Sequence, residues 1–553
     1  MKKHFLTTAL CSAILLMAGS TVRAQVSHGG TPHYHMTKAP VKTEVLASIN
    51  NDTYLQEDIL GNKMGTPMRV GVVQSTNITN TTHGTITTEA DGTRVWRMAV
   101  SSPNATFLNL HFSTFELPEG AELFFYNEPG TFVLGSFNAS NRLPEGNFYT
   151  QAIPGSTAII EYREPQAVAG QGRLTLSQVV HGYKDLFETV NNNTKGELGD
   201  AEGDCHINVA CSEGDDWHKQ IRATVAIQLT AGYYSFMCTG TVINNTNRDR
   251  KPYVLTAYHC QDLNQYGGLN GMTFYFNYQA SSCNGTTGAT NRSITGYTIL
   301  AKRAYSNGSD FCLVQMGSTI PLGYRAYYAG WDRNNVNSLT GAVCIHHPGG
   351  DIKKISLAKS VTRLSGSYAN FYQATWYSGA DNKGVTEQGS SGSGLFNADG
   401  LVVGQLFGGT SSCDYINSNT SQLNDMYGRI YASWTGGGSS TTRLSDWLDP
   451  TGTGVTTLEG IDYTDNVSIA TAELPSLQVY PNPSNGTIHI NVSDLGNANY
   501  KVFDLNGRCL YEGRTVLTTT VQSLNLNSLP AGTYRLLLYT AANSYSQTIV
   551  ITK

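Results

Sequence analysis

Charged residues and helical periodicity are both scarce in this chain of 553 residues. Charged side chains make up only 14% of it and the formal net charge is -5, so the sequence offers no basic surface for nucleic acid. Apolar runs of strand length, separated by Gly, Asn and Pro, recur instead of helical patterns. After residue 24 no apolar run approaches the roughly 20 residues that a membrane-spanning helix needs. We therefore predict a mainly β protein with no nucleic-acid partner and no transmembrane helix in its mature form.

The N-terminus has the pattern of a signal peptide. Lys2 and Lys3 precede an apolar run from Phe5 to Ala18, and residues 22–24 supply a small-residue cleavage site. We predict that residues 1–24 are removed during export. Export to an oxidising compartment permits disulfide bonds in the rest of the chain.

Cysteine is absent from residues 25–204, and strand-like runs such as 95–100 and 122–126 indicate a small β-sandwich there. We predict a separate β-rich domain over residues 25–195. It contains no catalytic cluster, so it is either a structural or binding domain or a prosegment that folds or silences the domain after it. The loop composition of residues 191–196 offers an endopeptidase a cleavage point between Lys195 and Gly196.

Most of the cysteines lie in the central part of the chain. No Cys-x-x-Cys spacing occurs, which argues against a zinc ribbon, whereas disulfides suit an exported domain. Spacing alone does not choose among the possible pairings of Cys205, Cys211, Cys238, Cys260, Cys283 and Cys413. Cys312 and Cys344 sit inside apolar runs, where we expect buried thiols or a fourth bridge.

The stretch Gly389-Ser-Ser-Gly-Ser-Gly394 places Ser391 between glycines, at a turn before an apolar strand. Acyl transfer needs a hydroxyl that stands clear of its backbone and N–H groups that converge on one point, and glycines permit both. Gly/Ser-rich loops are common, so this stretch alone is weak evidence.

Two upstream stretches strengthen the case. An apolar strand over residues 253–257 leads to His259, although a lone histidine near a strand end is more often structural. Asp310 opens another apolar strand, where a buried carboxylate needs a partner such as an imidazole N–H. His259, Asp310 and Ser391 give the chain order His, Asp, Ser, which is one of the known orders of a catalytic triad.

These segments resemble the signatures of trypsin-like serine proteases, and residues 196–462 more narrowly resemble the bacterial lysyl endopeptidases. The matching motifs include Asn244-Asn-Thr246, Phe276-Asn-Tyr278, Ala329-Gly-Trp-Asp-Arg333, Ile345-His-His-Pro348, Gly384-Val-Thr-Glu387, Asp425-Met-Tyr-Gly-Arg429 and Arg443-Leu-Ser-Asp-Trp-Leu-Asp-Pro450. The resemblance implies a trypsin-like double antiparallel β-barrel with the active site between the barrels. It also implies the disulfides Cys205–Cys413, Cys211–Cys283 and Cys238–Cys260.

The same resemblance assigns the catalytic roles. Ser391 would be the nucleophile, His259 the general base, and Asp310 the residue that orients the imidazole. The backbone N–H groups of Gly389 and Ser391 would form the oxyanion hole. No metal or cofactor is required, and the family match gives the adjacent histidines at 346–347 a structural explanation.

Asp425 matches the family's acidic residue at the base of the primary specificity pocket, and Gly408 and Gly409 would leave room for a side chain to pass. Asp414 is a lower-ranked rival for that role. We therefore predict a secreted serine endopeptidase that cleaves proteins or peptides after lysine and processes itself after Lys195. The alternatives are a broader Lys/Arg protease, or an inactive protease scaffold that serves as a surface binding protein.

Two departures from the family pattern concern the catalytic surroundings. Ser390 replaces the acidic residue that trypsins place before the nucleophile, so their activating ion pair with a new amino terminus is not available. Phe407 stands where the best-known lysyl endopeptidases have His, and the sequence offers no counterpart of the Trp that accompanies it. We expect these changes to alter rate and pH profile but not the triad.

The C-terminal part follows a polar linker predicted over residues 463–475. Residues 476–553 predict a small Ig-like β-sandwich. The runs Tyr480-Pro-Asn-Pro483 and Leu529-Pro-Ala-Gly-Thr-Tyr534 resemble the type A sorting domain of the type IX secretion system. This resemblance implies outer-membrane secretion machinery as a partner and a secreted or surface-attached product. A plain carbohydrate- or partner-binding module is the alternative.

Overall fold

The computed structural model describes residues 26–34, 41–60, 65–143, 146–186, 205–418, 420–463, 478–491, 496–504, 509–517, 522–539 and 544–552. The chain forms two compact units, residues 1–463 and residues 464–553. The predicted signal peptide and the Lys195–Gly196 cleavage point lie outside the described residues, as does nearly all of the predicted linker. Among the described residues, no helix combines the length and apolar character needed to cross a membrane.

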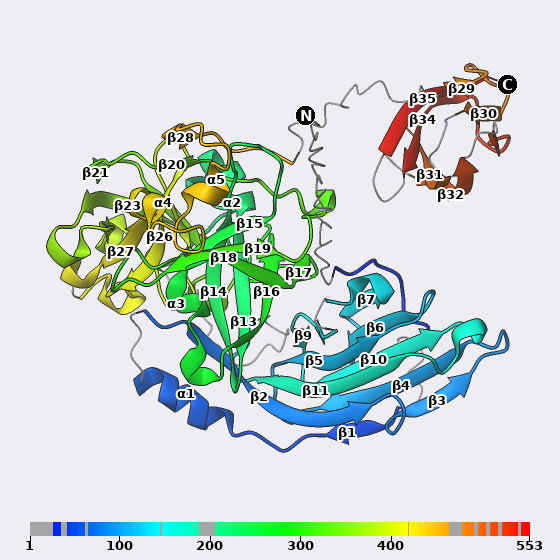
Figure 1. The fold of residues 1–553 in the computed structure, drawn as a ribbon, viewed down its shortest axis with the longest axis horizontal. Helices are drawn as coiled ribbons and strands as arrows, with labels where there is room; N and C mark the ends of the chain where they lie inside the picture. Colours follow the sequence, from blue (N-terminus) through cyan, green and yellow to red (C-terminus); the bar gives the residue numbers. More distant parts are fainter. Residues whose placement is uncertain are drawn as a thin grey trace, which may run out of the picture. The chain divides into compact units, whose positions relative to one another are not determined.

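The described residues between 26 and 186, called the N-terminal block below, form a sandwich of two β-sheets (Figure 1). Side chains at every second position of a strand face the core, as Trp96, Met98 and Val100 do from one sheet and Leu108 and Leu110 from the other. A helix, α1 (Asn51–Leu60), precedes the second sheet. The first sheet contains β1 (Thr43–Val45), β3 (Thr85–Thr88), β4 (Arg94–Ser101), β6 (Glu122–Asn127), β7 (Val133–Phe137) and β10 (Thr157–Glu164). The second contains β2 (Met68–Thr79), β5 (Phe107–Glu116), β8 (Phe148–Tyr149), β9 (Ile153–Pro154) and β11 (Arg173–Gly182).

The second sheet does not end at the block. Strand β2 pairs with β11 on one side and with β14 (Tyr234–Val242) on the other, in a register that sets Val72 opposite Tyr234 and Met68 opposite Met237. Strand β14 belongs to the part predicted to be catalytic, residues 205–463, which is called the catalytic region below. Figure 1 shows the two strands side by side. Apolar side chains from both regions share one core cluster, including Met68, Val70, Met237 and Tyr275. The N-terminal block and the first barrel are thus joined by a continuous sheet and a common core.

Buried polar groups also cross this junction. Asn109 and Gln228 exchange amide hydrogen bonds of 3.1 and 2.8 Å, and the Tyr275 hydroxyl donates to Gln228 Oε1 at 2.8 Å. A small cavity of about 20 Å³, room for one water molecule, is lined by Asn109, His111 and Gln228 among others. Because buried polar groups are costly when unpaired, these partners tie the two regions together.

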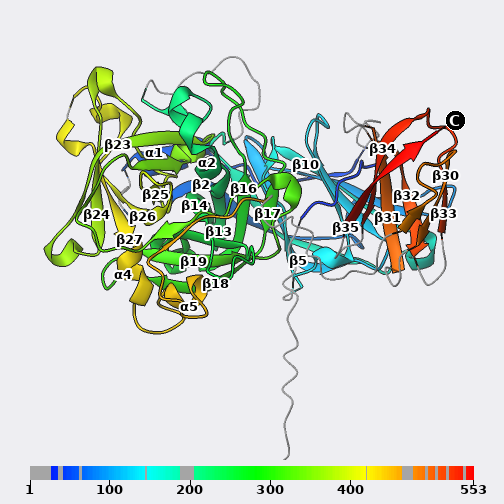
Figure 2. The same ribbon diagram turned by 90° about the horizontal axis from the view of Figure 1, so that it is seen from above.

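The catalytic region consists of two antiparallel barrels (Figure 2). This confirms the predicted mainly β, double-barrel fold. The first contains β13 (Thr224–Ala231), β14, β15 (Tyr253–Ala257), β16 (Leu269–Phe276), β17 (Ser293–Thr295), β18 (Tyr297–Arg303) and β19 (Phe311–Met316). The second contains β22 (Val343–His346), β23 (Lys354–Arg363), β24 (Phe371–Trp376), β25 (Gly394–Phe396), β26 (Val402–Gly409) and β27 (Asn424–Arg429). It is closed, because β25 pairs with both β22 and β26.

Short elements complete the catalytic region. The helices are α2 (His218–Ala223), α3 (Tyr258–Gln261), α4 (Ile430–Thr435) and α5 (Ser445–Leu448). The remaining strands are β12 (Ile207–Asn208), β20 (Trp331–Asp332), β21 (Ser338–Leu339) and β28 (Thr457–Leu458). Helix α3 follows β15 directly and carries His259.

Three disulfides join Cys205 to Cys413, Cys211 to Cys283 and Cys238 to Cys260, the pairs that the family resemblance implies. Cys312 lies in the core of the first barrel and Cys344 in that of the second, so they are separate thiols rather than a fourth bridge. Burial raises the pKa of each thiol to about 12, which leaves both unreactive.

The C-terminal unit is a β-sandwich with its own core. One sheet holds β29 (Gln478–Tyr480), β30 (Thr487–Asn491) and β33 (Gln522–Asn525), and the other β31 (Gly496–Phe503), β32 (Cys509–Leu517), β34 (Gly532–Tyr539) and β35 (Ser544–Ile551). Ile488, Val502, Leu536 and Ile549 contribute to the core between them. Two packed antiparallel sheets are the architecture predicted for this part of the chain.

Candidate active site

His259 and Asp310 form a buried pair in the first barrel. His259 Nδ1 lies 2.7 Å from Asp310 Oδ2, and the backbone N–H of His259 donates to Oδ1 at 3.2 Å. Asp310 has the left-handed backbone angle φ 56°, which Asp tolerates better than most residues, and its carbonyl accepts the N–H of Tyr258 at 2.8 Å. Burial raises the pKa of the Asp310 carboxyl, and the bonds from His259 oppose that shift. The imidazole is thereby fixed with Nε2 pointing away from the carboxylate.

Ser391 lies at the junction of the two barrels. Its carbonyl accepts the N–H of Thr239 in β14 at 2.8 Å and lies 3.7 Å from Cys260 Sγ, the residue after His259. The backbone of the predicted nucleophile therefore contacts β14 and the helix α3 that carries the predicted base. Within the described residues His259 Nε2 has no hydrogen-bond partner, so the bond to the Ser391 hydroxyl is not formed in this structure. Such bonds often shorten only when substrate binds.

The N–H groups predicted for the oxyanion hole are available. In the part of the chain that the structure describes, neither the Gly389 N–H nor the Ser391 N–H donates a hydrogen bond. Gly389 has φ 90°, and a Cβ there would lie 2.7 Å from the carbonyl oxygen of His347. Only glycine fits this position without displacing the backbone opposite.

Asp425 lies buried on β27, next to the loop that precedes the nucleophile. Its Oδ2 accepts hydrogen bonds from Ser411 at 2.5 Å, Thr386 at 2.6 Å and Trp376 Nε1 at 2.5 Å. Burial raises the pKa of this carboxyl, and the three bonds favour its anion. A Cβ on Gly409 would lie 2.2 Å from Asp425 Oδ1, so this glycine leaves space beside the carboxylate.

The other two residues considered for specificity are Gly408 and Asp414, and neither is part of the buried cluster around Asp425. Gly408 adjoins Gly409 on β26 and has φ 142°. Asp414 lies exposed in the short helical turn after Ser412, whose hydroxyl accepts its N–H. The structure thus brings Asp425 and Gly409 together and leaves Asp414 outside the buried cluster.

Phe407 sits among aromatic rings beside the candidate triad. Its ring meets that of His259 edge-on at 5.9 Å and lies 5.7 Å from Phe371 and 5.0 Å from Tyr305. A Cβ on Gly65, which belongs to the N-terminal block, would lie 3.1 Å from the Phe407 ring. The block therefore reaches the edge of the candidate site, a contact that no local sequence pattern predicts.

The histidines and cysteines near the site do not form a metal centre in this structure. His346 lies 2.7 Å from the Ser390 hydroxyl and 2.9 Å from that of Ser356, and His347 Nδ1 lies 2.8 Å from a backbone carbonyl. Ligand atoms of Cys205, His206 and Cys413 lie within 4.8 Å of one another. The two sulfurs are joined in a disulfide, however, and have no thiolate to offer an ion.

Comparisons with known proteins agree with the two-unit architecture. Residues 199–428 match the family model described as "Lysyl endopeptidase, C-terminal domain", and residues 478–552 match "Secretion system C-terminal sorting domain". A "Lysyl endopeptidase" of Pseudomonas aeruginosa is 29% identical over 391 residues, which cover 66% of this chain and 80% of that protein.

Solved structures with a similar fold are more distant. Protease Anisep from Arthrobacter nicotinovorans is 16% identical, covering 38% of this chain and 91% of its own, with a TM-score of 0.29. A Glu endopeptidase is 20% identical, covering 41% of this chain and 92% of its own, with a TM-score of 0.28. Scores this low carry no argument about function.

The family matches and the related protein support conclusions about export and chemistry. The sorting domain implies export by secretion machinery, so the product is secreted or attached to the cell surface. The match over the catalytic region implies peptide-bond hydrolysis by a serine nucleophile. The protein is a serine endopeptidase whose catalytic region is similar to lysyl endopeptidases and whose C-terminal unit matches a secretion sorting domain.

Proposed function

We propose that Ser391, His259 and Asp310 are the catalytic triad and that the enzyme cleaves proteins on the carboxyl side of lysine. The observation that carries the triad is the 2.7 Å contact of His259 Nδ1 with Asp310, which leaves Nε2 without a partner among the described residues. The next residue, Cys260, places its Sγ 3.7 Å from the Ser391 carbonyl oxygen. Ser391 Oγ attacks the scissile carbonyl while His259 Nε2 takes its proton. The same nitrogen then protonates the leaving amine, and water hydrolyses the acyl-enzyme by the reverse sequence.

The charges that develop in this reaction each have a proposed partner. Asp310 stabilises the imidazolium, and the Gly389 and Ser391 N–H groups bind the oxyanion. One oxyanion donor is typically worth about 10²–10³ in rate. Because these groups act as a unit, Ser391→Ala lowers turnover on the order of 10⁶-fold while the fold is kept. Activity of that variant near the wild-type level would remove Ser391 from the mechanism, and failure of a serine-directed phosphonate to label the wild type would favour the inactive scaffold.

Lysine specificity is supported by the buried Asp425 carboxylate. An anion held by three hydrogen bonds and flanked by a glycine suits a substrate ammonium, whereas a neutral side chain would leave the charge unpaired. Losing one partner of such a pair costs about 2–5 kcal/mol, roughly 30-fold to 5000-fold in kcat/KM. Asp425→Asn therefore abolishes the preference for lysine in a peptide-library cleavage assay, while Asp414→Asn, as the matched control, keeps it. An Asp425→Asn enzyme that still prefers lysine would refute this pocket, and equal cleavage after arginine by the wild type would establish the broader specificity.

Residues 25–195 are proposed as a prosegment. Support comes from the pairing of β2 with β14 and from the contact of Gly65 with Phe407, beside the proposed base. Self-cleavage after Lys195 fits a lysine-specific enzyme. The test is to add active enzyme in trans to a wild-type precursor and to a Lys195→Ala precursor. N-terminal sequencing of the wild-type product should give Gly196, and the variant should stay uncut at that bond. Processing of the variant at the same bond would contradict the proposal.

A further inference from the structure

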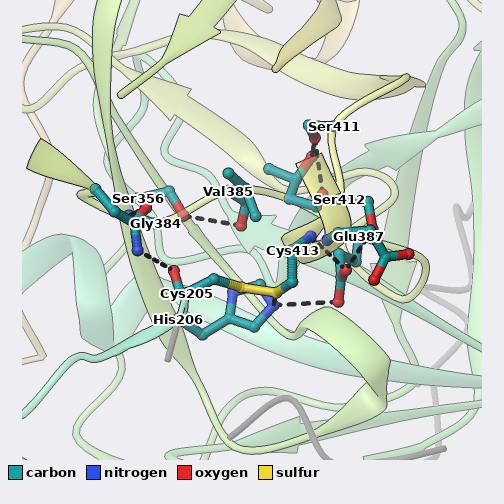
Figure 3. Close-up of a disulfide and its surroundings, with 12 residues drawn as sticks. Cys205, His206, Ser356, Gly384, Val385, Glu387, Ser411, Ser412 and Cys413 are labelled. Atoms are coloured by element: carbon teal, nitrogen blue, oxygen red, sulfur yellow. Dashed lines mark hydrogen bonds and ion pairs between the residues drawn. A yellow bond between two sulfur atoms is a disulfide. The ribbon is translucent and has the colours of Figure 1, made fainter. Parts of the chain in front are cut away.

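A cluster of polar groups behind the nucleophile turn (residues 387–391) centres on Glu387, as Figure 3 shows. Glu387 Oε1 accepts the N–H of Cys413 at 3.0 Å and the hydroxyl of Ser412 at 3.2 Å, and Oε2 lies 3.2 Å from His206 Nε2. Burial alone would favour the neutral acid, but the hydrogen bonds from His206, Cys413 and Ser412 lower the pKa of Glu387 to about 2. The side chain is therefore an anion held from two segments that are distant in sequence.

Glu387 is coupled to the nucleophile through the backbone. Its N–H donates to the Ser390 hydroxyl at 3.2 Å, and its carbonyl accepts the Ser390 N–H at 3.1 Å. The Ser390 hydroxyl is also 2.7 Å from His346 Nδ1, which holds the turn from the opposite side. Ser391 follows directly, so the orientation of the Gly389 and Ser391 N–H groups depends on how firmly this turn is held.

His206 is itself fixed by the fold. Its side chain is fully buried, and the residue before it is joined to Cys413 by a disulfide. The residues after it, Ile207 and Asn208, form β12, which pairs with Ile355 and Lys354 of β23. The disulfide on one side and the strand pairing on the other hold the backbone of His206 in place beside Glu387.

We infer that His206 is a positioning residue for catalysis: tethered by the Cys205–Cys413 bridge, it anchors Glu387 and so presets the two oxyanion N–H groups. The inference rests on the proposed catalytic role of Ser391. In trypsins an ion pair between the residue before the nucleophile and the new amino terminus orders this turn, and Ser390 cannot form that pair. Here the imidazole of His206, near the start of the catalytic region, would take the place of the amino terminus. Cleavage after Lys195 is then not needed to order the nucleophile turn.

The test separates positioning from folding. In purified enzyme, His206→Ala lowers kcat by roughly tenfold or more, because misplacing one oxyanion donor costs up to about 10²–10³, while KM stays within roughly threefold. His206→Gln, which can return an N–H to Glu387, recovers most of kcat. His218→Ala removes an exposed histidine from the same region and leaves kcat unchanged. Rates are expressed per active site, counted by phosphonate labelling of Ser391.

A disulfide pair supplies an independent comparison. The double variant Cys205→Ser/Cys413→Ser loses kcat per labelled site, whereas Cys211→Ser/Cys283→Ser, which removes a bridge that includes neither neighbour of the His206–Glu387 pair, does not. His206→Ala with wild-type kcat per site overturns the inference, as does a loss of activity fully explained by fewer labelled sites. Wild-type protein that shows no labelling at Ser391 overturns the triad itself, so the two failures are distinguishable.

Discussion

Acid should weaken the N-terminal block through His181. This side chain is fully buried in β11, with Nδ1 2.7 Å from the Ser102 hydroxyl and Nε2 2.8 Å from Asn51 Oδ1. Burial lowers its pKa to about 4, compared with 6.5 in an unfolded chain. Below pH 6.5 the unfolded state binds the proton first, so stability falls as the pH falls from 6.5 towards 4. Above pH 6.5 the contribution of this histidine is fully present.

The expected loss of unfolding free energy follows from the difference between the His181 pKa in the folded protein and in the unfolded chain. One pKa unit corresponds to about 1.4 kcal/mol, so at pH 5 His181 costs about 2 kcal/mol of folding free energy relative to pH 7. Protonation would keep the Nε2–H bond to Asn51 Oδ1 but would place a second N–H, at Nδ1, against the Ser102 hydroxyl.

Urea unfolding of full-length protein carrying Ser391→Ala, which prevents self-digestion, measures this effect. The difference in unfolding free energy between pH 7 and pH 5 should be about 2 kcal/mol smaller in His181→Gln, because Gln does not titrate. His218→Ala, which removes an exposed histidine, should keep the full difference. Equal pH dependence in the His181→Gln variant and its parent would refute the reasoning.

Three further outcomes are expected. Asp310→Asn should lower kcat on the order of 10⁴-fold with unchanged thermal unfolding, because the imidazole loses its orienting anion; a loss below tenfold in steady-state kinetics would contradict this. Gly409→Ala should reduce kcat/KM for lysyl substrates more than it changes stability, since its Cβ would meet Asp425 Oδ1 at 2.2 Å, and equal cleavage rates would argue against the pocket. Removing the Cys238–Cys260 bridge, which spans 22 residues, should cost about 3 kcal/mol in urea unfolding, and an unchanged midpoint would refute that assignment.

The sequence predicted the parts of the site that stand at the ends of apolar runs. His259 follows β15 and Asp310 precedes β19, and these strands pair over their whole length, which brings the two side chains within 2.7 Å. A strand ending in a histidine and a strand opening with an aspartate are local patterns that can be recognised in one sequence. The mainly β fold was predictable for the same reason, whereas the double barrel was predicted from the family resemblance alone.

The support of the site was not predictable in this way. His206 and Glu387 are 181 residues apart, and no local sequence pattern around either residue predicts their contact. The aromatic rings around Phe407 come from separate loops and strands. The pairing of β2 with β14 was also hidden, because any exposed strand edge offers the same backbone donors and acceptors and its side chains do not specify which edge will meet it.

That pairing bears on how the proposed prosegment would leave. Cutting the bond after Lys195 removes one covalent link but none of the ladder between β2 and β14, the shared core or the Asn109–Gln228 amide pair. Dissociation would expose the edge of β14 and the shared apolar cluster to water, and burial of apolar surface is the main favourable term in such association. It would also remove the Asn109 amide from Gln228, which keeps its bonds to Tyr275 and Ser235. A cut prosegment should therefore remain bound until its own strands are digested. Size-exclusion chromatography of freshly processed Ser391→Ala protein, cut in trans, should show both fragments eluting together, whereas separate elution at neutral pH would refute this reasoning.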